Sequence, residues 1–160
     1  MSSPSVRGWL FVAVQAVLLG ALILLPGGDT WPTPAWLRGL GLALIVAGLA
    51  LIALASMRLG PALTATPVPT ANGRLITSGL YHRVRHPIYS AVLLIVLGLT
   101  LRSGSWLIAV VAAVTAAFFN LKATWEEARL AETYPDYPAY TEQVPRFVPR
   151  PWSTANPQTK

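Results

Sequence analysis

The chain has 160 residues, of which 54% are hydrophobic and only 11% are charged, and it carries a net charge of +6. An ordinary soluble domain carries roughly twice that share of charged residues, so the composition excludes a soluble globular protein. The chain has no cysteine, which excludes disulfide bonds, thiolate metal sites and cysteine nucleophiles.

Two long apolar segments open the chain. The first covers 8–25 and contains a single polar side chain, Gln15, and the second covers 39–57 without any charge. Each is close to the roughly 20 residues that cross a hydrocarbon core of about 30 Å. Two shorter apolar segments, 87–101 and 106–121, follow later and are separated by four residues. We interpret this second pair as a helical hairpin.

The predicted architecture is an all-α membrane protein with about four transmembrane helices. We expect one domain over 1–152, followed by a disordered tail. The predicted helices cover about 8–25, 37–57, 87–101 and 105–132, and the tail covers 153–160.

The basic residues predict the orientation of these helices. With four spans, both termini and the 58–86 loop lie on one side, and that side holds every basic residue except Arg38 and Arg102. The positive-inside rule puts that side in the cytoplasm. The positive charge therefore follows from membrane orientation, and no nucleic-acid partner is expected.

The hairpin brings polar residues together at its two ends. His86 and Tyr89 open the third predicted helix, while Lys122 and Glu126 follow the fourth apolar segment. Lys122 and Glu126 are four residues apart and share a helix face. Glu127 is rotated by about 100° from Glu126, so we expect it to point elsewhere. The spacing alone is equally typical of a solvated salt-bridge face.

Prolines shape the remaining segments. The 58–79 connection is polar and Pro-rich, which argues against a long helix, and we expect an extended piece ending at Gly79. Pro135 and Pro138 are predicted to break the helix that follows Glu126. The stretch 144–152 is predicted to be extended.

Motifs for nucleotide loops, zinc proteases and serine hydrolases are absent from the sequence, and its two histidines, His82 and His86, are too few for a metal site. No metal is expected. A site with so few catalytic groups suits a reaction whose reactivity resides in a cofactor.

Two stretches carry a family resemblance, "GRLITSGLYHRVRHPIYSAVLL" and "KATWEEARLAETYPDYPAYTEQVPRFVP". They resemble the T-S-G-x-Y…R-H-P-x-Y, E-E-x-x-L, Y-x-x-Y and R-F-x-P blocks of the isoprenylcysteine carboxyl methyltransferase and phospholipid N-methyltransferase superfamily of integral-membrane enzymes. With the hairpin between them, the blocks cover about half of the chain.

The resemblance implies S-adenosylmethionine as the methyl donor. It implies a cofactor pocket built from the cytoplasmic loop, the start of the third helix and the C-terminal segment after the fourth. By position, the cofactor contacts would be Gly73, Arg74, Leu75, Ile76, Tyr81, His86, Pro87, Ile88, Tyr89 and Glu126. Those at 73–76 would act through backbone groups. Glu126 would accept hydrogen bonds from the ammonium or the ribose hydroxyls, and Arg83 or Arg85 could face the carboxylate.

Lys122 stands where prenylcysteine methyltransferases carry an arginine that addresses the substrate, so the resemblance makes it the substrate-binding residue. A lysine lacks the bidentate fork that suits a carboxylate, so the acceptor group stays open between carboxylate, amine and thiol. No residue is assigned as catalytic. We expect a lipophilic acceptor that enters from the bilayer of a bacterial inner membrane, and a cofactor that enters from the cytoplasm.

Two other functions remain open at this point. One is an NADPH-dependent membrane enzyme similar to sterol reductases, and the other is a non-catalytic membrane protein of the NnrU-like kind. The absence of charge inside the apolar segments argues against an ion or proton pathway.

Overall fold

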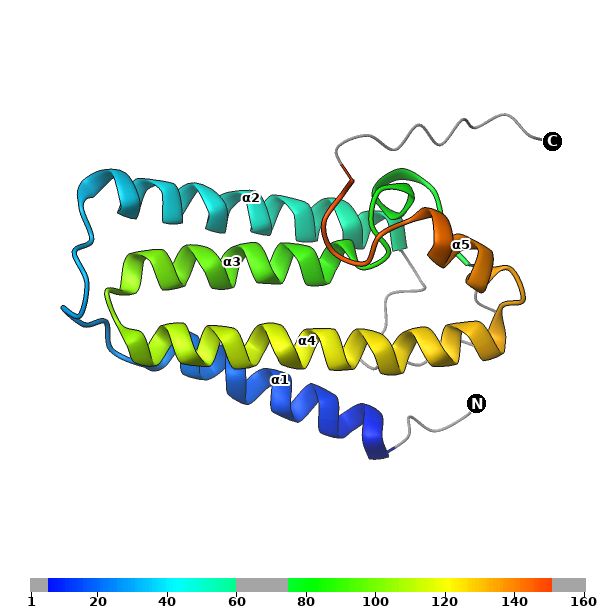
Figure 1. The fold of residues 1–160 in the computed structure, drawn as a ribbon, viewed down its shortest axis with the longest axis horizontal. Coiled ribbons are helices and arrows are strands. Elements are labelled where there is room, and N and C mark those ends of the chain that lie inside the picture. The colour runs from blue at the N-terminus through cyan, green and yellow to red at the C-terminus, as the bar shows by residue number, and fades with distance from the viewer. Residues whose placement is uncertain (1–5, 60–74, 151–160) are drawn as a thin grey trace.

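A computed structural model describes residues 6–59 and 75–150 of the chain, and within these residues it contains helices and no strand (Figure 1). The elements in chain order are α1 (Val6–Leu24), α2 (Ala35–Leu59), the short 3₁₀ helix η2 (Gly79–His82), α3 (Pro87–Ser103), α4 (Trp106–Thr133) and α5 (Tyr137–Gln143). The predicted all-α class is confirmed, and the ends of the four long helices lie within two residues of their predicted positions.

The four long helices run along one common axis. In Figure 1, α3 lies between α2 and α4, and α1 crosses α4. The α1–α2 loop and the α3–α4 turn lie at one end, whereas η2, α5 and the first turn of α1 lie at the other. The elements around both chain ends are therefore at the same end of the bundle as η2, as the four-span prediction requires.

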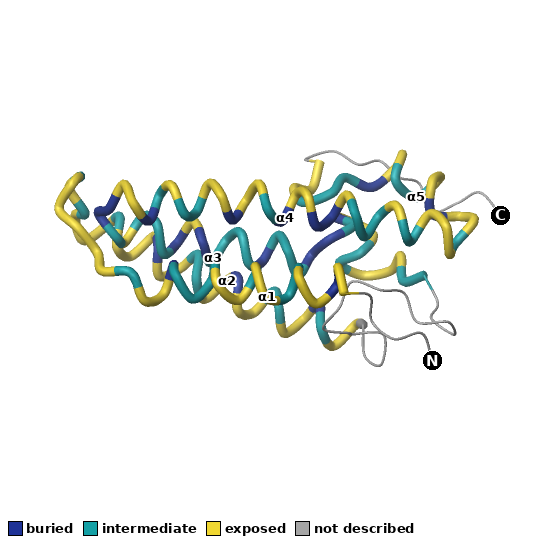
Figure 2. The backbone as a smooth tube through the Cα atoms, turned by 90° about the horizontal axis from the view of Figure 1, so that it is seen from below, coloured by how far each residue is buried: buried dark blue, intermediate teal, exposed yellow. Residues whose placement is uncertain are grey.

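Length and apolar composition allow α1, α2 and α4 to cross a membrane, and α3 is a shorter apolar helix of 17 residues. Large apolar side chains are exposed along the outside of these helices, including Val17, Val46 and Val110. Figure 2 shows that buried positions lie mainly where helices face one another. A lipid environment explains this pattern, because lipid tails solvate apolar side chains that water would not.

Small residues let α2 and α3 pack closely. Gly41, Gly48 and Ala55 are buried and recur every seven residues on α2. A Cβ atom added at Gly41 would lie 2.6 Å from the carbonyl oxygen of Gly98, and one at Gly48 would lie 2.7 Å from that of Ala91. The two backbones therefore approach as in other small-residue helix interfaces of membrane proteins.

The loops at the end opposite η2 hold each other. Gly28 and Thr30 donate backbone hydrogen bonds of 2.8 Å to the carbonyl oxygens of Ser103 and Gly104. Gly104 ends α3 in the left-handed conformation (φ +60°), as a helix C-terminus commonly requires. These contacts fix the tight α3–α4 turn that brings the ends of the hairpin together.

The predicted break of the helix before Pro135 is confirmed, because α4 ends at Thr133. The prediction for Pro138 was wrong in part, because this proline lies in the first turn of α5, where the missing N–H costs nothing. The described residues before Gly79 are not helical, Ser78 is extended, and the single turn η2 begins at Gly79 with φ +65°. The predicted tail at 153–160 lies outside the described residues.

Candidate functional site

The first turn of α3 faces α4 through His86 and Tyr89. The Tyr89 hydroxyl donates a hydrogen bond of 2.8 Å to Oε2 of Glu126. The His86 ring stacks on the Tyr89 ring, with the centroids 5.1 Å apart and the planes 4° from parallel. His86 is buried, and the ring of Phe119 also packs against Tyr89, with the centroids 5.1 Å apart. The structure therefore brings together the residues that the hairpin was expected to juxtapose.

Glu127 faces the same cluster, so the expectation that it points elsewhere was wrong. Its Oε1 lies 3.0 Å from Nε2 of His86, while Nδ1 of the same ring lies 3.8 Å from Oε2 of Glu126. The imidazole thus bridges two consecutive glutamates, because its two nitrogens lie on different edges of the ring. Although the two glutamates are rotated by about 100° along α4, both lie near the ring of His86, the residue just before α3.

Two arginines complete the cluster around Glu127. Arg85 donates from Nε to Oε1 of Glu127 at 3.0 Å, and its Nη2 lies 3.0 Å from the same oxygen. Arg146 donates from Nη2 to Oε2 of Glu127 at 2.5 Å. The Nη1 group of Arg85 also donates to the carbonyl oxygens of Thr141 and Val144. The Arg85 guanidinium is therefore engaged within the chain, whereas Arg83 is exposed.

The segment 144–147, which we call the strap, crosses the start of α3. The backbone N–H groups of Arg85 and His86 donate to the carbonyl oxygens of Pro145 (2.9 Å) and Arg146 (3.1 Å). The Ser90 hydroxyl donates to the carbonyl oxygen of Phe147 at 2.6 Å. The stretch 144–152 was predicted to be extended, whereas the structure shows bends at 144 and 146–148. The docking on the start of α3 was not predicted, although Arg146 of the R-F-x-P block, which binds Glu127, could have indicated it.

Lys122 is buried between α1, α3 and α4, with 4% of its surface exposed. Its ammonium donates to Oε1 of Gln15 at 2.5 Å and lies 5.2 Å from the centre of the Tyr89 ring. Gln15 was not among the predicted site residues. The signal that could have identified it is that it interrupts an otherwise apolar helix, where a polar side chain is expected to have a partner.

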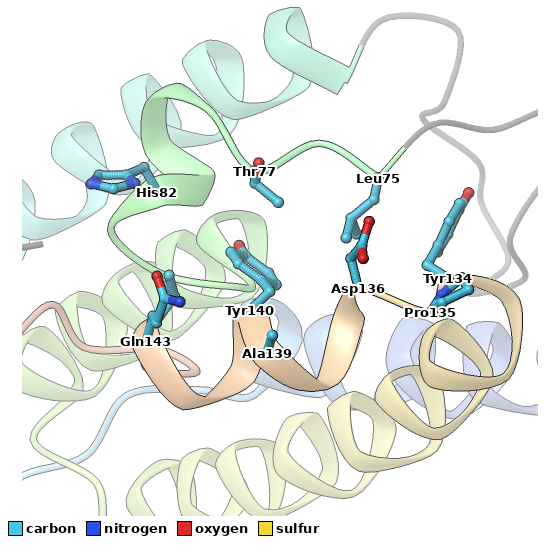
Figure 3. Close-up of a pocket in the computed structure, with 10 residues that line it drawn as sticks. Leu75, Thr77, His82, Tyr134, Pro135, Asp136, Ala139, Tyr140 and Gln143 are labelled. Atoms are coloured by element: carbon cyan, nitrogen blue, oxygen red, sulfur yellow. The ribbon is translucent and has the colours of Figure 1, made fainter. Parts of the chain in front are cut away.

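A cavity of about 650 Å³ lies beside this cluster, between the 75–82 segment and the 134–144 segment (Figure 3). Its lining residues are Leu75, Thr77, His82, Tyr134, Pro135, Asp136, Ala139, Tyr140, Gln143 and Val144. The side chains of Asp136, just before α5, and of Tyr140 in α5 extend toward the 75–82 segment (Figure 3).

Among the described residues, one predicted cofactor contact lines the cavity, whereas His86, Tyr89 and Glu126 lie in the α3–α4 cluster. Leu75 lines the cavity and Ile76 follows it in the same segment, whereas Gly73 and Arg74 lie outside the described residues. At the start of α3, Pro87 is buried and Ile88 is partly buried.

Tyr81 contacts Tyr140, one of the residues that line the cavity. Its carbonyl oxygen accepts a hydrogen bond from the Tyr140 hydroxyl. Burial raises the pKa of the Tyr81 hydroxyl above its ordinary value, and the nearby Glu126 carboxylate and Tyr140 raise it further. Burial likewise raises the pKa of Tyr140 to about 12. Both hydroxyls are therefore protonated at neutral pH and able to donate.

Comparison with known proteins identifies the family. The sequence profile of the phospholipid methyltransferase family matches residues 36–137. Over 80 residues the chain is 36% identical to the cobalt-zinc-cadmium resistance protein CzcN of Cupriavidus metallidurans. The aligned part is 49% of this chain and 37% of the length of that relative. Since the family profile covers more than half of the chain, including α3 and α4, this integral membrane protein belongs to the phospholipid methyltransferase family.

Proposed function

We propose that the chain transfers a methyl group from S-adenosylmethionine to a lipophilic acceptor that reaches the site from the bilayer. The observation that carries this proposal is the Tyr89–Glu126 hydrogen bond, with His86 stacked on Tyr89, beside the cavity under the 75–82 segment. Membership in a family of membrane methyltransferases supports it.

The cavity has the chemistry that the methyl donor requires. Its volume of about 650 Å³ lies within the range of about 300–1,000 Å³ that is usual for small-molecule sites. The rings of Tyr134 and Tyr140 offer apolar faces for an adenine ring, and the Asp136 carboxylate can accept hydrogen bonds from ribose hydroxyls. Leu75 and Ile76 would contribute backbone groups.

Glu126 is suited to the charged end of the same ligand. One of its oxygens accepts the Tyr89 hydroxyl, and the other accepts no hydrogen bond from any residue in the described ranges. About a quarter of its side-chain surface (24%) is exposed. In our proposal, the oxygen that no described residue occupies accepts a hydrogen bond from the ammonium group of the ligand.

The bound methyl donor would supply a methyl group activated on a sulfonium sulfur. The protein has to hold the acceptor in line with that carbon and exclude water. In our proposal, His86, Pro87, Ile88 and Tyr89 form the wall of the site on α3, and Lys122 addresses the acceptor. In our proposal the protein lies in a bacterial inner membrane, and this end of the bundle faces the cytoplasm, as the positive-inside rule favours.

Calorimetry on the detergent-solubilised full chain tests the proposal. S-adenosylmethionine and its demethylated product S-adenosylhomocysteine should both release or absorb heat in a saturable titration, and NADPH should not. Membranes containing the protein should incorporate radiolabel from the methyl donor into the lipid fraction. If neither sulfur compound binds, the proposal is wrong.

A further inference from the structure

Arg38 and Arg102 lie at the end of the bundle opposite η2 and the candidate site. Arg38 is in the first turn of α2, Arg102 is in the last turn of α3, and both side chains are exposed. These two helix ends lie beside the α1–α2 loop and the α3–α4 turn (Figure 1). The first turn of a helix is the positive end of its dipole and disfavours a cation, and no acidic residue lies in the first turn of α2. An anion beside Arg38 would therefore be stabilising.

Close packing of α2 on α3 holds the two arginines together. The missing side chain of Gly41 leaves room for the stem of Arg102, whose Cγ atom would lie 2.6 Å from a Cβ atom added at that glycine. From there the Arg102 guanidinium reaches the first turn of α2, where Nη1 donates to the carbonyl oxygen of Arg38 at 2.9 Å. Nε and Nη2 of Arg38 donate to the Thr33 hydroxyl at 3.1 and 3.0 Å. Both guanidinium groups are therefore held by neutral acceptors.

No carboxylate neutralises this arginine pair within the described ranges 6–59 and 75–150. No Asp or Glu oxygen there lies within 4.0 Å of either guanidinium. Asp29 is the one acidic residue of the sequence outside 126–142, and its side chain is exposed. Each guanidinium has five N–H donors, of which the hydrogen bonds above use only some. The pair therefore offers two positive charges and several planar donors to one anion, which suits a phosphate group.

The arginine pair lies at the depth of lipid headgroups. The apolar stretch 39–57 of α2 is about 28 Å long at 1.5 Å per residue, close to a hydrocarbon core of about 30 Å. Arg38 directly precedes this stretch, so it lies where the hydrocarbon core ends. At the same end, the rings of Trp31 and Trp106 lie 5.1 Å apart, and Trp36 is exposed two residues before Arg38. Tryptophans are enriched at the boundary between membrane and water.

We infer that Arg38 and Arg102 bind the phosphodiester of an anionic phospholipid, at the membrane surface opposite the candidate functional site. Leu42 and Val46 follow Arg38 on the same face of α2, at i+4 and i+8, and both are exposed. They would contact the acyl chains, so a phosphate attached to a lipid fits this surface better than soluble phosphate does. The lipid would join the first turn of α2 to the last turn of α3. This site is independent of methyl transfer, because it lies at the other end of the bundle.

Native mass spectrometry of the full chain in detergent tests the lipid site. The three probes share the same acyl chains: phosphatidylglycerol is anionic, phosphatidylcholine carries a choline group that offsets the phosphate charge, and diacylglycerol has no phosphate. We expect the first phosphatidylglycerol to bind about tenfold more tightly than either of the other lipids. Glycerol 3-phosphate, a phosphate without acyl chains, should not displace it at the same concentration. Equal binding of the three lipids, or displacement by glycerol 3-phosphate, would overturn the inference.

Variants locate the binding site on the chain. Arg38→Gln and Arg102→Gln should each weaken the binding of phosphatidylglycerol about fivefold. The Arg38 side chain donates to Thr33 and not across the α2–α3 interface, so Arg38→Gln tests the site even where Arg102→Gln loosens the helix packing. Arg58→Gln removes the same charge from an exposed position at the other end of α2 and should bind the lipid as the wild type does. Equal losses in Arg38→Gln and Arg58→Gln would show that net charge alone attracts the lipid, and the inference would be wrong.

Discussion

Tyr89 joins the first turn of α3 to α4 by donating a hydrogen bond to Glu126 at 2.8 Å. The neighbouring Glu127 is occupied differently, because it accepts from Arg85, Arg146 and His86 at once. Two consecutive glutamates thus have different surroundings. One oxygen of Glu126 accepts no hydrogen bond from the described residues, whereas both oxygens of Glu127 belong to an ion network. This division leads to separate predictions for the two residues.

Glu126→Gln should weaken cofactor binding and leave the fold nearly intact. The amide oxygen of glutamine can still accept the Tyr89 hydroxyl, but the negative charge for the cofactor ammonium is lost. We expect S-adenosylhomocysteine to bind at least about tenfold more weakly, as measured by calorimetry. Glu132→Gln, an exposed position on the same helix, is the matched control. Unchanged affinity in Glu126→Gln would contradict the assignment.

Glu127→Gln should instead destabilise the protein. Removing the carboxylate leaves the Arg85 and Arg146 guanidinium groups, whose side chains are 11% and 26% exposed, without their common partner. We expect a loss of about 2 kcal/mol or more in the free energy of unfolding. Thermal or denaturant unfolding in detergent measures this loss. Glu126→Gln serves as the comparison, since it loses no ion pair with an arginine. Equal unfolding midpoints of the two variants would show that the network does not stabilise the fold.

The order and bounds of the long helices could be predicted because apolar runs of membrane length leave few alternatives. Polar contacts between elements were harder to predict. The positions of Glu126 and Glu127 on one helix could be predicted from their spacing. That spacing does not show that the His86 ring, just before α3, lies near both carboxylates. Similarly, the sequence of 144–147 predicts an extended chain, whereas its docking depends on backbone groups of Arg85 and His86.

Gly41→Ala should destabilise the α2–α3 interface. An added methyl group would lie 2.6 Å from the backbone carbonyl oxygen of Gly98, which cannot move aside as a flexible side chain would. The matched control is Gly39→Ala, two residues away, where nothing lies within 4 Å of the added atom. The control should be neutral or slightly stabilising, since alanine favours a helix over glycine by about 1 kcal/mol. Similar thermal midpoints of the two variants would exclude close packing at Gly41.

Buried tyrosines should make the protein sensitive to alkaline pH. Burial raises the pKa of Tyr140 to about 12, from about 10 in an unfolded chain. The folded state therefore holds this proton more tightly, and the resulting stability is complete below pH 10 and is lost as the pH rises toward 12. Burial shifts the pKa of Tyr81 and Tyr137 in the same direction. The thermal midpoint should fall between pH 10 and 12, and less steeply in Tyr140→Phe.

Arg146→Gln should release the strap from the start of α3. Arg146 binds Glu127, and donates as well to Oδ1 of Asn120 at 2.7 Å, so it ties the strap to α4. Without it, the hydrogen bonds from the Arg85 and His86 amides to the strap carbonyls should open more often. Amide hydrogen exchange should therefore accelerate at these two positions, by about tenfold for a loss of 1.4 kcal/mol in local stability, while exchange in the middle of α3 should not change.

Arg150→Gln, at an exposed position just after the strap, is the control and should exchange as the wild type does. Unchanged exchange at both amides in Arg146→Gln would mean that the backbone contacts alone hold the strap.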